Sequence, residues 1–344
     1  MGGGFAAPIV PDADVHPRGA ATRILPRPSS RSQRSRVIPR VLPARGEPAS
    51  AVSVPDGADR RSIHWVEIWP FLLLQASCLA VFAVGWSPIA VAVAVGLYVV
   101  RMFGVTAFYH RYFSHRSFRL GRAMQFAGAL LGASAAQRGP LWWAAHHRRH
   151  HRHSDTGADV HSPHAHGVLW SHIGWIAAPE HQGTDLEQVR DLAVFPELRW
   201  LDRHYYVVPF ALLGALLLAG WLLERHAPQL GTDAWQLAVW GFCLSTAALF
   251  HVTAAVNSLG HLLGRRVWPT RDHSRNSLVL ALLTLGEGWH NNHHWCPGAA
   301  RQGFRWWEID ISYYLLRLLA VCGLVHDLRP LPARARADAR RLRR

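Results

Sequence analysis

Residues 71–108 read FLLLQASCLAVFAVGWSPIAVAVAVGLYVVRMFGVTAF, and Arg101 is the single charged side chain among them. The turn-forming tripeptide Trp86-Ser87-Pro88 divides this stretch into two apolar runs, Phe71–Trp86 and Pro88–Phe108. A helix needs about 20 predominantly apolar residues to cross the hydrocarbon core of a bilayer, and both runs approach that length. The stretch therefore predicts a hairpin of two membrane-spanning helices.

A second pair of apolar runs follows, Val207–Leu223 and Ala234–Phe250. Four such runs in two pairs favour a membrane protein over a soluble protein with buried helices. We therefore expect an all-α integral membrane protein with four transmembrane helices in two hairpins.

Arginines lie next to one end of each hairpin, and basic residues are retained on the cytoplasmic side of a membrane. The connectors at the other end carry almost none. The flanking arginines are Arg60, Arg61, Arg111, Arg116, Arg119, Arg122, Arg265 and Arg266. This distribution predicts a multi-pass protein with both termini and the long central segment in the cytoplasm.

The chain has 37 basic and 22 acidic residues, a formal net charge of +15, which raises the question of nucleic-acid binding. Ten arginines lie in the first 61 residues and seven in the last sixteen, so the charge belongs largely to the tails. Such tails suit anionic lipid headgroups, and we expect no nucleic-acid partner. We expect a disordered Arg/Pro-rich tail over 1–62, a membrane domain over 63–328 and a basic tail over 329–344.

Three shorter apolar segments, Met124–Ala136, Ser277–Gly286 and Ile311–Val325, lie outside the four runs. They are too short to span a bilayer, so we expect them to lie at its cytoplasmic surface. Together they predict a helical cap seated against the membrane.

Histidines form three clusters on the predicted cytoplasmic side: HRYFSH at 110–115, HRRHH at 147–151 and HNNHH at 290–294. On a helix, residues i, i+3 and i+4 share one face, so the last two clusters each present three imidazoles together. Neutral imidazole binds metals such as iron, zinc, copper and nickel. Eight ligands exceed the capacity of one ion, which predicts a di-metal centre. They are His110, His115, His147, His150, His151, His290, His293 and His294.

A ninth candidate ligand is His261, one helical turn after Asn257 and just beyond the fourth run. A polar pair at the end of a membrane helix is costly unless it serves a site or meets water. We therefore include both residues in the candidate centre.

The order HxxxxH, HRxHH, NSxxH and GEGWHNNHH on four apolar runs resembles the membrane fatty-acyl desaturases, in particular the bacterial branch similar to stearoyl-CoA delta-9 desaturases. The resemblance covers about residues 65–325 and is strongest over 137–159 and 272–294. Val160 stands where that family usually has proline.

This resemblance implies two iron ions and O₂ as co-substrate. It assigns residues matching His110, His115, His151 and His294 to one iron, with the residue matching Asn257 reaching it through water. It assigns five to the other iron: His147, His150, His261, His290 and His293. The implied fold has a bent hydrophobic tunnel between the spanning helices and the cap.

The implied reaction removes two vicinal hydrogens from a long saturated acyl chain and leaves a cis double bond at the delta-9 position. We expect acyl-CoA as the substrate, with carrier-protein and lipid esters as the other forms that the chain could take. No flavin, haem or cysteine-cluster motif is evident, so a separate donor such as a ferredoxin or reductase must bring electrons.

Four acidic residues adjoin the histidine clusters: Asp155, Asp159, Asp272 and Glu287. Carboxylates commonly orient metal-bound imidazoles by accepting their second N–H, and we expect that role here.

Two alternatives remain at this stage. A di-iron membrane hydroxylase or monooxygenase needs the same ligands as a desaturase. A metal transporter with histidine-rich loops would place ionisable side chains within several spans. The two predicted hairpins are instead almost wholly apolar, and His251, next to the fourth run, is the main exception.

Residues 146–151 read HHRRHH, so the i, i+3, i+4 spacing can be counted from His146 or from His147. Substitution distinguishes the two possibilities. We expect His147→Ala, His150→Ala and His151→Ala each to lose metal and desaturation, because these three imidazoles share one helix face. His146→Ala and His153→Ala should retain metal and at least partial activity. Metal analysis of the purified variants tests this assignment, and loss of metal from His146→Ala but not from His147→Ala would refute it.

Overall fold

The computed structural model describes residues 65–341, and in that range every regular element is a helix. The expectation of an all-α chain is confirmed for this range. The expected tail over 1–62 and the arginines Arg60 and Arg61 lie outside the described residues.

The apolar runs form long helices. The first run is α1 (Trp65–Ser77), the 3₁₀ turn η1 (Cys78–Ala80) and α2 (Val81–Val84). The second is α3 (Pro88–Phe103), continued by the π-helix η2 (Gly104–Ser114). The third is α10 (Val207–His226), and the turn η6 (Pro228–Leu230) follows it. The fourth comprises α11 (Ala234–Gln236), the π-helix η7 (Leu237–Leu244), α12 (Ser245–Ser258) and η8 (Leu259–His261).

The remaining elements gather near one end of these long helices, and we call them the cap. In chain order they are α4 (Arg122–Ala133), α5 (Pro140–His153), α6 (Pro163–His166), α7 (Val168–His172), η3 (Gly174–Ala177), η4 (Pro179–His181), η5 (Leu186–Val189), α8 (Arg190–Ala193), α9 (Pro196–Arg203), α13 (Leu278–Leu283), α14 (His290–Trp295), α15 (Ile311–Val321) and α16 (Ala333–Arg341). The last of these falls within the basic segment 329–344.

Three continuous helices are long and apolar enough to cross a membrane: Pro88–Ser114, Val207–His226 and Ala234–His261, with 27, 20 and 28 residues. Each extends beyond its predicted run, because the helix continues into polar sequence. The first run forms only a shorter apolar helix, Ile68–Val84. The fourth span and the two-hairpin arrangement therefore stay predictions.

The helix that begins at Pro88 has a clear local cause. The hydroxyl of Ser87 accepts a hydrogen bond from the Ala90 N–H at 3.1 Å, and proline occupies the first helical position. Thirteen residues later Arg101 is buried, and its guanidinium donates to Thr246 Oγ1 at 2.7 Å and to the Ser134 carbonyl at 3.3 Å. The single charge of the first two runs thus faces protein and satisfies its donors there.

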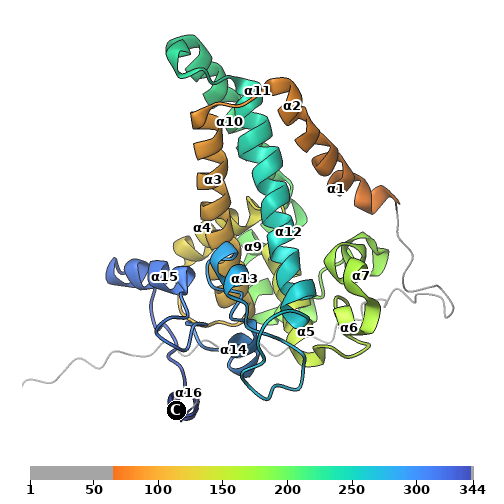
Figure 1. Ribbon diagram of the computed structural model, residues 1–344, viewed down its shortest axis with the longest axis vertical. Helices are drawn as coiled ribbons and strands as arrows, with labels where there is room; N and C mark the ends of the chain where they lie inside the picture. Colours follow the sequence, from red (N-terminus) through yellow and green to blue (C-terminus); the bar gives the residue numbers. More distant parts are fainter. Residues whose placement is uncertain (1–64, 342–344) are drawn as a thin grey trace, which may run out of the picture. The chain divides into compact units, whose positions relative to one another are not determined.

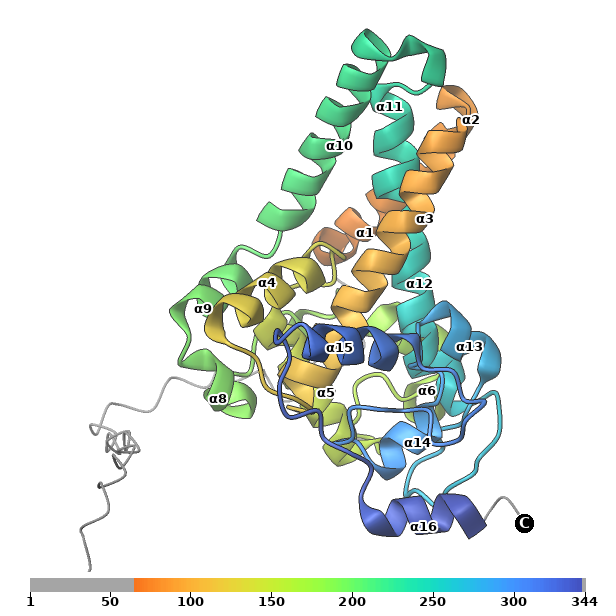
Figure 2. The same cartoon turned by 90° about the vertical axis from the view of Figure 1, so that its left-hand side faces the viewer.

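Figure 1 shows α3 and α12 running side by side, with the cap elements gathered near one end. Figure 2 shows α4 and α15 lying across that end of α3. The apolar side chains of α13 and α15 are largely exposed, including Leu278, Val279, Leu318 and Val321. Helices that lie at a membrane surface present an apolar face to the lipid, which is the placement expected for these two segments.

The third expected surface segment, now α4, packs closely on η2. Gly128 and Gly132 face the rings of Phe108 and Tyr109, and a side chain on either glycine would overlap those rings. The glycines therefore let α4 approach the π-helix that carries His110.

We expect Gly128→Leu to destabilise the fold, because overpacking of a tight contact costs about 1–3 kcal/mol. Gly96→Leu is the matched control, since Gly96 is also helical and has nothing near its side-chain position. Thermal unfolding in detergent should show a lower midpoint for Gly128→Leu only. Equal midpoints would contradict the close contact between α4 and η2.

Candidate metal centre

The cluster HxxxxH depends on the π-helix η2. In an α-helix, residues five apart lie about 140° apart around the axis and face different directions. Here the His115 N–H donates to the His110 carbonyl at 3.3 Å, five residues back, as in a π-helix. The wider turn brings the two imidazoles together, with ring centroids 4.9 Å apart.

The central cluster lies on α5. Asp202 caps the start of this helix, since its Oδ1 accepts from the N–H groups of Leu141 and Trp142, both at 2.9 Å. Pro140 occupies the first position of the helix. The helix continues through His153, so the HxxHH spacing acts as helical spacing, as predicted.

The third cluster lies on the short helix α14, which its two asparagines lock in place. Asn291 Oδ1 accepts from the N–H groups of Val267 and Trp268 at 2.7 and 2.6 Å. Asn292 accepts from the Trp268 indole at 2.8 Å and donates to Glu308 at 2.8 Å. Both amides are buried, and they fix a helix too short to be stable alone.

The structure collects the nine histidines into two groups. In the first, one ring nitrogen of each residue lies within 4.8 Å of those of the others; its members are His110, His115, His147, His151 and His293. Within it the Nε2 atoms of His115 and His147 are 2.8 Å apart, and those of His151 and His293 are also 2.8 Å apart.

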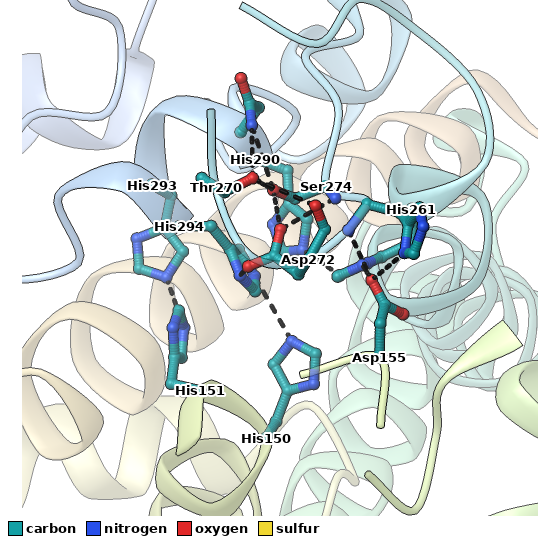
Figure 3. A network of polar contacts seen from close by, with 12 residues as sticks. His150, His151, Asp155, His261, Thr270, Asp272, Ser274, His290, His293 and His294 are labelled. Atoms are coloured by element: carbon teal, nitrogen blue, oxygen red, sulfur yellow. Dashed lines mark hydrogen bonds and ion pairs between the residues drawn. The ribbon is translucent and has the colours of Figure 1, made fainter. Parts of the chain in front are cut away.

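The second group has four members, His150, His261, His290 and His294. The Nε2 atoms of His261 and His290 are 3.0 Å apart. Figure 3 shows the second group beside two members of the first, with His293 facing His151 and His294 facing His150.

This grouping by distance differs from the division between two irons that the resemblance implied. His147 and His293 belong with His110, His115 and His151, whereas His294 belongs to the second group. The cause is helix geometry: residue i+4 lies about 40° from residue i, whereas i+3 lies about 60° away on the other side. In each HxxHH segment the first and last histidines therefore share a group, and the middle one joins the other group.

The four expected acids all contact histidines of the centre through Nδ1. Asp155, Asp159 and Asp272 lie 2.8, 2.9 and 2.8 Å from the Nδ1 atoms of His261, His150 and His294, respectively. Glu287 pairs with Nδ1 of His110. With Nδ1–H donated to a carboxylate, the lone pair of Nε2 is free to face a metal.

Burial sets the ionisation of these groups. Loss of water contact, reinforced by neighbouring imidazoles, lowers the pKa of five histidines well below its usual value: His115, His147, His151, His290 and His293. Burial alone would raise the pKa of the aspartates, but hydrogen bonds and the charge of their histidine partners lower it below the usual range for Asp155, Asp159 and Asp272. A set of imidazoles of which burial keeps these five neutral, with carboxylates behind others, is a suitable donor set for a borderline divalent metal.

Several contributors were not predicted. Arg111, counted above among the arginines that set orientation, is buried and donates to Glu287 at 3.0 Å and to Asp310 at 3.1 Å. Gln302 donates to Glu287 at 2.7 Å. His161 lies 3.2 Å from Asp159, and burial lowers the pKa of this histidine to about 3. The available sequence signal for this role was that Arg111 directly follows His110. Its position beside an apolar run suggested instead that it flanks the membrane.

The other candidates lie beside the two groups. Asn257 is half-buried and lines the same cavity as His290. His146 is outside both groups, and its Nδ1 contacts the Trp142 carbonyl at 2.9 Å. His153 is exposed.

A cavity of about 670 Å³ adjoins the centre. Three of the histidine ligand candidates line one part of it, His110, His147 and His290, and most of the other lining residues are apolar or aromatic, several of them from α1, α10 and α12. It extends to Phe242 and Cys243 of η7, in the helix Ala234–His261. The cavity thus joins the metal centre to the apolar helices.

Comparison with known proteins identifies the family. The sequence model described as fatty acid desaturase matches residues 84–321. The chain belongs to this family. As a fatty acid desaturase it is an oxidoreductase that acts on acyl chains, and it resembles an sn-1 stearoyl-lipid 9-desaturase of Anabaena variabilis with 36% identity over 270 residues, 78% of this chain and 94% of the relative.

Two plant relatives show the range of the family. An acyl-CoA 5-desaturase of Anemone leveillei is 35% identical over 296 residues, 82% of this chain and 87% of the relative. A palmitoyl-monogalactosyldiacylglycerol delta-7 desaturase of Arabidopsis thaliana is 36% identical over 263 residues, 75% of this chain and 66% of the relative. These relatives therefore differ in the carrier of the acyl chain and in the position of the double bond.

We expect Asp159→Asn to weaken metal binding by about 10–100-fold, because the amide no longer orients His150 as a carboxylate does. Iron retained by the purified protein during dialysis against graded chelator measures this effect. Glu197→Gln is the control, since Glu197 pairs with Arg122 away from the centre. Iron retention equal to wild type in Asp159→Asn would contradict the orienting role.

Proposed function

We propose that the chain is an oxygen-dependent di-iron desaturase that introduces a cis double bond, at the delta-9 position, into a long saturated acyl chain. One observation carries the proposal: histidines of both groups line the apolar cavity, His110 and His147 from the first and His290 from the second. An acyl chain in this cavity would pass beside both metal positions.

The first group would hold one iron and the second group the other, with Asn257 contributing through water. Iron at these positions would supply the activation of O₂ that removal of hydrogen from an unactivated chain requires. The overall balance is one O₂, two protons and two external electrons, together with two hydrogens from the chain, giving one C=C bond and two waters. The electrons would come from a separate ferredoxin or reductase.

The protein's own side chains would position both reactants. Asp155, Asp159, Asp272 and Glu287 hold four imidazoles in a fixed orientation, so that little reorganisation is needed. Met102 and Val105, both buried, form part of the cavity wall beside His110 and exclude water from the chain.

The delta-9 position is proposed from the motif resemblance and from the similarity to the Anabaena variabilis lipid 9-desaturase. The cytoplasmic placement of the cap and of both termini is proposed from the arginine distribution around the spans. A hydroxylase would use the same ligand set, so the product must be identified chemically.

Expression in a desaturase-deficient host tests the proposal. We expect monounsaturated lipids with a delta-9 cis bond, identified by mass spectrometry of derivatised acyl chains, and about two irons in the purified protein. His290→Ala should abolish the product, whereas His226→Ala at the exposed end of α10 should not. A hydroxylated chain, or no product from an iron-loaded protein supplied with donor and O₂, would refute the proposal.

A further inference from the structure

We propose that the acyl chain enters the cavity sideways from the bilayer, between α1 and α10, and that the substrate is therefore a membrane glycerolipid rather than acyl-CoA. This inference rests on the proposed function and replaces the expectation of acyl-CoA drawn from the motif resemblance.

The rim of the cavity is formed by exposed side chains that are mostly apolar. Among the residues that line the cavity, the exposed ones are Pro70, Leu73, Ala136, Tyr206 and Phe210. Leu73 is 56% and Phe210 66% exposed. Apart from one phenol they are apolar, and they come from α1, the segment before α5 and the start of α10. A rim of this kind is stable against lipid tails and unfavourable against water.

The position of the rim along the apolar helices also favours entry from the bilayer. Phe210 lies in the first turn of α10, a helix of spanning length that rises from the cap beside α9 (Figure 2). Pro70 and Leu73 lie in the apolar helix Ile68–Val84. The opening therefore lies where apolar helices meet the cap, which is the level of the bilayer interface.

Contacts with α12 hold α1 in place as one side of this opening. Its Gln75 contacts His251 of α12 at 3.2 Å, and His251 contacts His172 of α7 at 3.1 Å. The ring of Phe71 packs on that of Phe250, with centroids 5.0 Å apart. These contacts give the polar residue His251 a structural role outside the metal centre.

The charge of the cavity lining also suits a lipid. Arg138 is the single arginine among the cavity-lining residues, and the sequence contains no lysine. Its guanidinium lies over the rings of Trp142 and Tyr205, at 5.4 and 5.3 Å, in a setting typical of the bilayer interface. Asp202 is close enough to act on this charge. One cation in the lining, partly balanced by Asp202, suits the glycerol or headgroup region of a lipid.

Two labelled substrates distinguish a membrane lipid from coenzyme A as the carrier of the acyl chain. The iron-loaded full chain is placed in lipid vesicles with a ferredoxin, its reductase and O₂, and without any acyltransferase. One arm contains labelled distearoyl phosphatidylglycerol in the bilayer, and the other receives labelled stearoyl-CoA. We expect product in the lipid arm only.

Product from stearoyl-CoA at an equal or higher rate would overturn this inference while supporting desaturase activity. Product in neither arm, with iron and electron donor verified, would overturn the proposed function itself and the inference with it. The two failures are therefore distinguishable.

Leu73→Trp tests the opening directly. A bulkier side chain on the rim should reduce turnover of the bilayer lipid at least tenfold, with iron content and thermal midpoint unchanged. Leu72→Trp is the matched control, because Leu72 is the adjacent exposed residue of α1 and does not line the cavity. Wild-type turnover in Leu73→Trp, or equal loss in both variants, would refute access between α1 and α10.

Discussion

A buried imidazole must satisfy two nitrogens, and this constraint organises the cap. Four histidines direct Nδ1 at a carboxylate and thereby turn Nε2 toward the neighbouring imidazoles. The carboxylates need further partners in turn, which accounts for the buried Arg111 and Gln302 around Glu287. The polar network extends outward until it reaches backbone groups or solvent, and the helices of the cap are placed around it.

The apolar helices contribute a second, independent constraint. They carry His110 and His261 beyond the ends of their apolar runs, so helix length sets how far these imidazoles project into the cap. The cavity follows from the same arrangement, since it lies between the membrane helices and the histidines they support. The reactive centre and the apolar chamber are consequently parts of one assembly of helices.

The sequence predicted the ligand candidates because the HxxHH spacing is local and depends only on helix periodicity. It did not predict their division, because the group that His150 or His293 joins depends on how α5 faces α14. The π-helical turn between His110 and His115 was also missed, since its cause lies in tertiary packing. Arg111 shows the same limit: a charge beside an apolar run can flank the membrane or be buried in protein.

The middle histidine of each HxxHH segment, His150 in α5 and His293 in α14, belongs to the group of the other segment. This arrangement has a consequence for biosynthesis. The first group is incomplete without His293, and the second needs His290 and His294 as well as His150. The first group is therefore complete only when the chain has passed residue 293, and the second only when it has passed residue 294. Neither site can have its full set of ligands until the long helices that carry His110 and His261 have both been made.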